Sequence, residues 1–185
     1  SKMTKNGGDA FILQRNALAI VIYHFGQALR ETKKAKRQLH SIFFTEAADR
    51  KAVEAFKTAS FAMVKAEENC NLVQEYAQRL DSQLLVLKSG KKNDKRTYLE
   101  HDEFELMNDL LKLKEKTVDV RILLHSFGLG PVYYMGIYRR ELKSRLKHRK
   151  EEVNEVLGIL EALKKKLYNL LALEKKIENE AKELQ

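Results

Sequence analysis

One proline, Pro131, stands in this sequence of 185 residues, and only 8 glycines accompany it. Proline and glycine end helices and build tight turns, so a chain with so few of them can form long uninterrupted helices. A β-sandwich or barrel needs many such turns and is not expected here. Apolar residues make up 44 % of the sequence, which is enough for a sizeable core. We therefore predict an all-α fold, an antiparallel bundle of about four long helices.

Breaks in the apolar pattern divide the chain into helices. Asp9 and Thr45 are suited to cap helix starts, and Gly128-Leu129-Gly130-Pro131 is a strong break because glycine suits a helix end and proline a helix start. The expected segments are a disordered leader over 1–8, helices over 9–44, 45–87, 97–127 and 131–185, and a polar loop over 88–96.

Apolar residues at helical spacing mark the expected buried faces. In the first two helices these are Phe11, Leu18, Ile22, Phe25 and Leu29, then Val53, Phe56, Met63, Cys70, Val73, Ala77, Leu80, Leu84 and Leu87. The third helix carries two stripes, one of Phe104, Met107, Leu111, Val118 and Ile122, the other of Leu106, Leu110, Leu113, Val120 and Leu124. Because two stripes predict burial on two sides, we expect the third helix to be the best covered.

The end of the fourth helix has a heptad repeat, with apolar residues in alternating steps of three and four and Glu174 at the one skipped position. A helix over 131–185 would be about twice as long as the third, so its end is expected to project beyond the bundle. We therefore divide the chain into a helical bundle over 9–150 and a heptad segment over 151–185 that binds a second copy or a protein partner. The predicted partner face is Val153, Val156, Leu160, Leu163, Leu167, Leu170, Ile177 and Leu184.

Positive charge is segregated along the sequence. The chain holds 35 lysines and arginines against 26 aspartates and glutamates, for a net charge of +9. The stretches 30–37, 88–96 and 139–150 carry net charges of +4, +4 and +6, so the rest of the chain is net negative. In an up-down-up-down bundle the first and third stretches fall at similar heights on neighbouring helices. The predicted anion-binding surface is Lys33, Lys34, Arg37, Arg139, Arg140, Lys143, Arg145, Lys147, Arg149 and Lys150.

Two kinds of polyanion fit such a surface. A nucleic acid would be bound through its phosphates, largely independently of base sequence. Tyr133, Tyr134 and Tyr138 precede the basic stretch 139–150 and either stack on bases or pack on the bundle. An anionic membrane surface attracts the same cations. The longest apolar run, residues 17–25, is too short to cross a bilayer, so no transmembrane segment is expected.

Few residues are candidates for chemistry. Cys70 is the only cysteine and lies on an apolar stripe, so we expect a buried hydrophobe and an intracellular, cytoplasmic protein. His101 and Glu105 share a helix face within an acidic cluster, which either offers metal ligands or complements the helix dipole. Arg96 and His101 form an Arg-x4-His pair that resembles the short motif of HEPN ribonucleases, which implies RNA cleavage across a dimer. We predict no catalytic residue, no metal site and no cofactor.

Three hypotheses of function follow, in this order. The first is a non-enzymatic scaffold or interaction protein, a homo-oligomer or a binder of another protein, that assembles through the heptad face. The second is sequence-independent nucleic-acid binding through the basic surface of the first and fourth helices. The third is binding to an anionic membrane surface. Each hypothesis depends on a surface that must be open in the folded chain.

Overall fold

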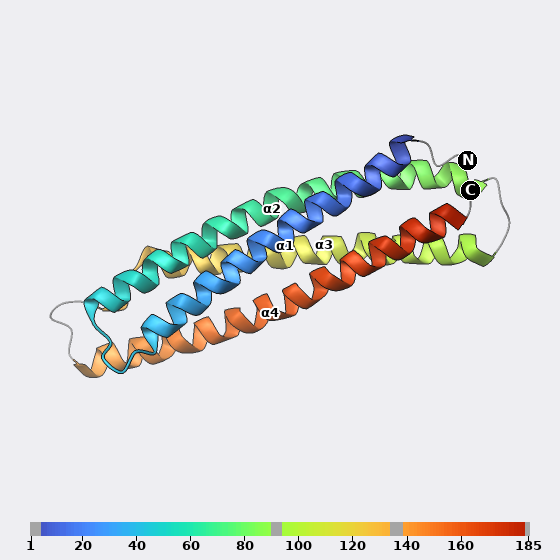
Figure 1. The fold of residues 1–185 in the computed structure, drawn as a ribbon. Helices are drawn as coiled ribbons and strands as arrows, with labels where there is room; N and C mark the ends of the chain where they lie inside the picture. Colours follow the sequence, from blue (N-terminus) through green and yellow to red (C-terminus); the bar gives the residue numbers. More distant parts are fainter. Residues whose placement is uncertain (1–4, 90–93, 134–138, 184–185) are drawn as a thin grey trace. The chain divides into compact units, whose positions relative to one another are not determined.

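The computed structural model describes the backbone of residues 5–89, 94–133 and 139–183, and the side chains of 11–76, 101–102, 104–133 and 139–183. Over these residues the chain forms four α-helices and no strand, so the predicted all-α bundle is confirmed. The helices are α1 (Lys5–Leu39), α2 (Glu46–Ser89), α3 (Asp94–Leu129) and α4 (Arg139–Glu183), drawn in Figure 1. None of the described helices has a stretch long and apolar enough to cross a membrane.

The first two helices differ in part from the expected boundaries. α1 begins at Lys5, inside the leader expected over 1–8, and it ends at Leu39, five residues before the expected end. The cap predicted for α2 is confirmed, because the Thr45 hydroxyl accepts a hydrogen bond from the Ala48 N–H at 3.1 Å. The chain therefore leaves the helix between 40 and 45, in a connection that the sequence had placed inside the first helix.

The fourth helix starts later than predicted. It begins at Arg139 and has 45 residues, whereas the sequence placed its start at Pro131. Residues 131–133 are not helical. The backbone N–H of Tyr133 donates instead to the buried Asp49 carboxylate at 2.9 Å, which anchors this segment to the start of α2.

The chain packs as two compact units, each built from a part of all four helices. Unit 1 comprises residues 1–22, 67–116 and 165–185, and unit 2 comprises residues 23–66 and 117–164. This division differs from the expected one at residue 150, because α4 contributes to both units and no unit consists of its end alone.

Ion pairs and hydrogen bonds join the helices of unit 1. The Gln14 side chain of α1 donates to the Val73 carbonyl of α2 at 3.5 Å. On α3 and α4, Asp102 pairs with Lys176 at 3.0 Å and Asp109 with Lys166 at 3.0 Å, so the two helices run antiparallel. The described core is Phe11, Leu18, Val21, Cys70, Val73, Leu106, Leu110, Leu113, Leu167, Leu170, Ile177 and Ala181.

Unit 2 combines aromatic side chains with a face of alanines. The Phe56 and Phe127 rings meet edge to face with their centroids 5.2 Å apart, joining α2 to α3. The small side chains on α2 leave room for these rings and for the neighbouring helices. The alanines are Ala48, Ala52, Ala55, Ala59, Ala62 and Ala66, all buried.

The heptad face of α4 is buried inside the chain. Val153, Val156, Leu160 and Leu163 belong to the core of unit 2, and Leu167, Leu170 and Ile177 to the core of unit 1, each with 6 % or less of its surface exposed. Leu184 lies outside the described residues. α3 has 36 residues, more than expected, and Ala181 near the end of α4 is fully buried. Over its described residues, the face on which the assembly hypothesis rested is therefore covered within the chain.

α3 is less covered than the sequence predicted. Its second stripe is buried from Leu106 to Leu124. On the first stripe, however, Phe104, Leu111 and Ile122 are 73 %, 52 % and 54 % exposed. The expectation that both stripes are fully buried is wrong, because among the described side chains of α3 the second stripe is buried and the first is largely exposed.

Candidate anion-binding surface

The net positive charge of the chain comes almost entirely from unit 2. Unit 2 holds 18 lysines and arginines against 10 aspartates and glutamates, for a net charge of +8. Unit 1 holds 17 against 16, for a net charge of +1. Because of this net charge, unit 2 is the part of the chain that attracts an anionic partner more strongly.

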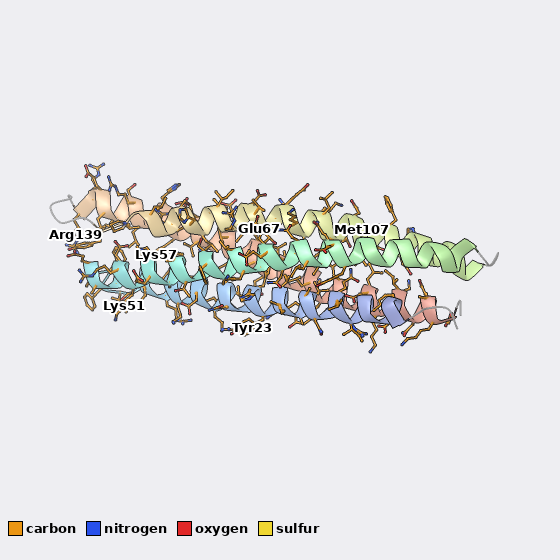
Figure 2. The ribbon with its side chains drawn as sticks, turned by 90° about the horizontal axis from the view of Figure 1, so that it is seen from above. Tyr23, Lys51, Lys57, Glu67, Met107 and Arg139 are labelled. Atoms are coloured by element: carbon orange, nitrogen blue, oxygen red, sulfur yellow. The ribbon has the colours of Figure 1, made fainter. Side chains whose placement is uncertain are left out.

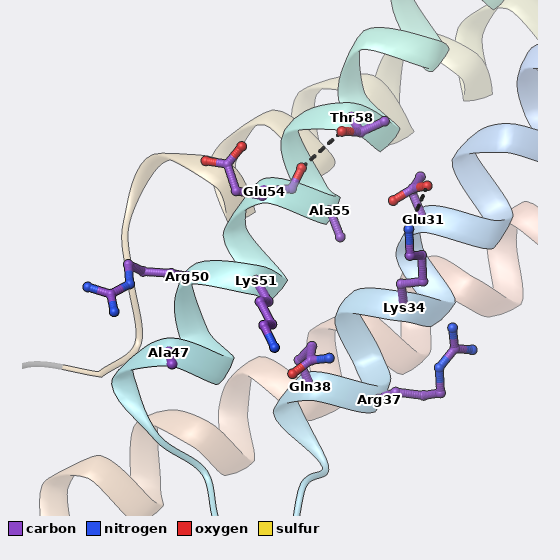
Figure 3. Close-up of a pocket in the computed structure, with 10 residues that line it drawn as sticks. All are labelled: Glu31, Lys34, Arg37, Gln38, Ala47, Arg50, Lys51, Glu54, Ala55 and Thr58. Carbon is purple, nitrogen blue, oxygen red and sulfur yellow. Dashed lines mark hydrogen bonds and ion pairs between the residues drawn. The ribbon is translucent and has the colours of Figure 1, made fainter.

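A groove of about 670 Å³ lies between the end of α1 and the start of α2 in unit 2. Figure 3 shows Lys51 and Gln38 pointing toward one another across it, and Arg37 and Arg50 at its two outer sides. We call it the basic groove. Its lining residues are Glu31, Lys34, Arg37, Gln38, Ala47, Arg50, Lys51, Glu54, Ala55 and Thr58.

Some cations of the basic groove are paired and others are not. The Lys34 ammonium lies 3.3 Å from the Glu31 carboxylate. Arg50 lies 3.7 Å from Glu46. Among the described side chains, no carboxylate forms an ion pair with Arg37 or Lys51. These two cations, one from each wall, are available to an anion.

Two large apolar side chains project beside the basic groove. In the connection from α1 to α2, Ile42 is 93 % exposed and Phe43 is 81 % exposed. The next residue, Phe44, turns inward and packs edge to face on Tyr133, with ring centroids 6.1 Å apart. Thr45 then caps α2. The connection is thus held by its last two residues while Ile42 and Phe43 face solvent, which is unusual for adjacent large apolar side chains.

The basic start of α4 adds further cations to the same unit. Arg139, Arg140, Lys143 and Lys147 are exposed, and Figure 2 places Arg139 and Lys51 at the same end of unit 2. Farther along α4, partial burial and the nearby charges of Lys150 and Lys36 lower the pKa of His40. Because the charge of Lys150 acts on His40, Lys150 of α4 lies near the end of α1.

Two arginines on α4 are already engaged. The Arg149 guanidinium lies over the Phe127 ring at 4.8 Å and 3.7 Å from the Glu152 carboxylate. Arg145 also makes an interaction within the chain. These two residues of the predicted surface are less available than the exposed cations around them.

The cations predicted on the first helix divide between two neighbouring helices. Lys33 pairs with Glu161 of α4 at 3.1 Å, which neutralises it. Lys34 and Arg37 line the basic groove with α2 instead. Sequence reasoning missed Arg50 and Lys51 on the opposite wall. The available signal was two adjacent cations just after the first turn of the second helix, close in sequence to the basic end of the first helix.

The aromatic residues proposed for base stacking are only partly described. Tyr134 and Tyr138 lie outside the described residues. Tyr133 is half-buried, and its ring packs on Phe44. Its backbone is held by Asp49. Tyr133 therefore acts in packing and does not offer a free ring for a base.

Unit 1 contains the acidic cluster identified in the sequence. The ligand atoms of His101, Asp102 and Glu105 lie within 4.8 Å of one another. Burial raises the pKa of Asp102, but hydrogen bonds with Glu180 and Lys176 outweigh it and bring that pKa below its usual value. The Lys176 ammonium, 3.0 Å from Asp102, supplies the positive charge that a metal ion would bring. The side chain of Arg96, the partner of His101 in the HEPN-like pair, lies outside the described residues.

A second carboxyl in unit 1 is buried without a partner. Glu174 is fully buried, and neither of its carboxyl oxygens has a hydrogen-bond partner among the described side chains. Burial raises its pKa to about 8; the charge of Arg15 opposes this shift and that of Glu178 adds to it. Arg15 itself is paired with Glu178. Glu174 is therefore mainly neutral between pH 4.5 and about 8, where an ordinary glutamate is ionised.

Comparison with known proteins found no matching family model, no matching curated protein and no matching solved structure. Function is therefore inferred from the chain's own surfaces. Unit 2 offers the basic groove, a pair of exposed apolar side chains beside it, and the basic start of α4.

Proposed function

We propose that this protein binds the surface of anionic membranes through unit 2. Ile42 and Phe43 enter the headgroup layer, and the surrounding cations contact lipid phosphates. The observation that carries the proposal is the pair of projecting apolar side chains, 93 % and 81 % exposed, on the unit with a net charge of +8. The interface of an anionic bilayer can bury the two apolar side chains and attract the positive charge of unit 2 at the same time.

The expected energies are sufficient for reversible binding. Each lysine or arginine near an anionic bilayer contributes about 1 kcal/mol. Burial of a large apolar side chain such as Ile42 or Phe43 adds about 1.5–3 kcal/mol. Stable attachment of peripheral proteins takes two such signals, and here charge and apolar contact supply them together.

A membrane accounts for the apolar pair better than a nucleic acid does. Phe43 has an aromatic face on which a base can stack, but Ile42 has none, whereas both side chains can enter a headgroup layer. Tyr133, the described member of the tyrosine group, is occupied by Phe44. The phosphate contacts would be similar for both partners, so the apolar pair is the feature that discriminates between them.

Sedimentation with vesicles tests the proposal. Vesicles of phosphatidylcholine alone are compared with vesicles that contain about 30 mol % phosphatidylserine, at low and high salt. We expect binding only to the anionic vesicles, falling as salt rises. The variant I42S/F43S loses apolar contact without touching the core, so its affinity should fall roughly tenfold or more.

The matched control is F104S/L111S, which removes two exposed apolar side chains from unit 1. Its vesicle binding should equal that of the wild type. Equal losses in both variants would contradict the proposal, as would absence of binding at low salt. Binding to mixed-sequence RNA or DNA that is tighter than binding to vesicles, and unchanged in I42S/F43S, would favour the nucleic-acid alternative.

A further inference from the structure

We infer that the basic groove is a binding site for a headgroup that carries two or more phosphates. Its ligand is an inositol phosphate, either on a phosphorylated inositol lipid or free in solution. The lipid-borne form rests on the proposed function, and the free form does not. The groove volume of about 670 Å³ lies within the range of roughly 300–1,000 Å³ typical of small-molecule sites. A single phosphate would leave most of it empty.

The placement of the cations favours several phosphates over one. Arg37 and Lys51 stand on opposite walls, and neither forms an ion pair with a described carboxylate. Arg50 lies at the outer side of the α2 wall and Arg37 at that of the α1 wall (Figure 3). An arginine fork binds a phosphate through two parallel hydrogen bonds, and a lysine adds a point charge. A headgroup with phosphates on two sides of a ring can contact both walls, whereas phosphatidylserine carries one phosphate.

Charge is ordered along the groove. The acids Glu31 and Glu54 lie one to two turns farther from the α1–α2 connection than Arg37 and Arg50, because α1 runs toward the connection and α2 away from it. Glu54 also pairs with Lys57 at 3.6 Å. At the end next to the connection, Glu46 pairs with Arg50, so Arg37 and Lys51 are the cations of the groove that are available to phosphates there.

That end of the groove adjoins the exposed apolar pair. Gln38 and Ala47, which line the groove, are each two residues from the connection 40–45 that carries Ile42 and Phe43. If Ile42 and Phe43 enter the headgroup layer, the mouth of the groove lies at the depth of the lipid phosphates. A lipid headgroup can then occupy the groove while its acyl chains remain in the bilayer.

Two probes separate the lipid from the free ligand. Inositol 1,4,5-trisphosphate is titrated into the full chain by calorimetry. Vesicles with phosphatidylinositol 4,5-bisphosphate are compared with phosphatidylserine vesicles of equal total charge. The variant R37Q/K51Q removes one cation from each wall, and the control R30Q/K164Q removes one arginine and one lysine from exposed positions of unit 2 outside the groove. All four positions are exposed, and thermal melts check that both variants stay folded.

We expect R37Q/K51Q to weaken trisphosphate binding at least tenfold, and the control to weaken it less than about threefold. Equal losses of trisphosphate affinity in both variants would overturn the inference, because binding would then depend on the overall charge of unit 2 and not on the basic groove. Binding to phosphatidylserine vesicles with no preference for the bisphosphate, together with no trisphosphate binding, would overturn it while leaving the proposed function intact. Groove-dependent trisphosphate binding without any vesicle binding would support the free ligand and contradict the proposed function.

Discussion

Unit 1 and unit 2 are built from the same four helices but differ in where they place ionised groups. Unit 1 is nearly neutral, with a net charge of +1, and it buries the carboxyls of Asp102 and Glu174. Unit 2 has a net charge of +8 and buries one carboxylate, Asp49, which accepts a backbone hydrogen bond. The acids of the chain are thus concentrated away from the cations of unit 2. Unit 2 is therefore the unit whose net charge favours an anionic partner, while unit 1 carries the pH-sensitive core.

The largest effect is expected for Glu174, the unpartnered carboxyl in the core of unit 1. Its pKa is about 8 in the folded chain, against an ordinary value of 4.5, so folding stabilises the protonated form. The contribution of Glu174 to the free energy of unfolding is fully present below pH 4.5 and is lost as pH rises through 8. The loss is about 1.4 kcal/mol per pH unit between the two pKa values, and on the order of 5 kcal/mol in all. Glutamine at 174 does not titrate. The free energy of unfolding of E174Q, measured in urea from pH 5 to 9, should therefore exceed that of the wild type increasingly as pH rises.

The difference between the two proteins is the quantity to follow, because Glu180 also has a raised pKa, about 7, and titrates in both. The exposed Glu155 on α4 provides a matched control, since E155Q removes one carboxylate from unit 2 without burial. A wild-type-minus-E174Q difference that stays constant with pH would contradict the buried, unpartnered state of Glu174.

The next effect concerns the aromatic contact in the core of unit 2. Replacing Phe127 by alanine removes a ring that lies 5.2 Å from Phe56 and beneath the Arg149 guanidinium. Large-to-small changes of this kind cost about 3–5 kcal/mol. Hydrogen exchange should lose protection mainly in residues 117–129 and in the part of α2 that belongs to unit 2. Equal loss of protection in unit 1 would show that the two units unfold as one.

A smaller effect is expected for the anchor of residues 131–133. In D49A the Tyr133 N–H loses its acceptor, a change that costs about 1–3 kcal/mol. The Tyr133 amide should exchange much faster with solvent, whereas the amides of the unit 1 core keep their protection. Unchanged exchange at Tyr133 would contradict the hydrogen bond.

The smallest effect is expected for the ion pair between Lys33 and Glu161. Both side chains are about half exposed, at 49 % and 51 %. Solvent and salt screen such pairs, so K33M should change the free energy of unfolding by less than about 1 kcal/mol. A loss above about 2 kcal/mol in thermal melts would mean that this pair is more deeply buried than the structure has it.

The fold class was predictable because the spacing of apolar residues along the sequence indicates helices, however those helices are arranged in space. Phe11, Leu18, Phe25 and Leu29 stand at helical spacing in the sequence and are buried in the structure. The alanine face of α2 was missed, since alanine carries little hydrophobic signal although it decides how closely helices approach.

The site was less predictable because surfaces depend on which helix covers which face. The heptad residues of α4 were correctly identified as an apolar face, but the sequence cannot say that α4 packs along its length on its own chain. Ile42 and Phe43 show no helical period of their own and were absorbed into the expected first helix. Arg50 and Lys51 became part of a groove only once the start of α2 met the end of α1.

The most direct measurement of membrane insertion uses a tryptophan at the exposed apolar pair. The chain has no tryptophan, so F43W carries a single fluorophore in unit 2, and Y168W places one at an exposed position of unit 1. On addition of phosphatidylserine vesicles, the emission of F43W should shift to the blue and be quenched by brominated lipids, while that of Y168W stays unchanged. An unshifted F43W spectrum in the presence of bound vesicles, or an equal shift in both variants, would contradict insertion of the connection between α1 and α2.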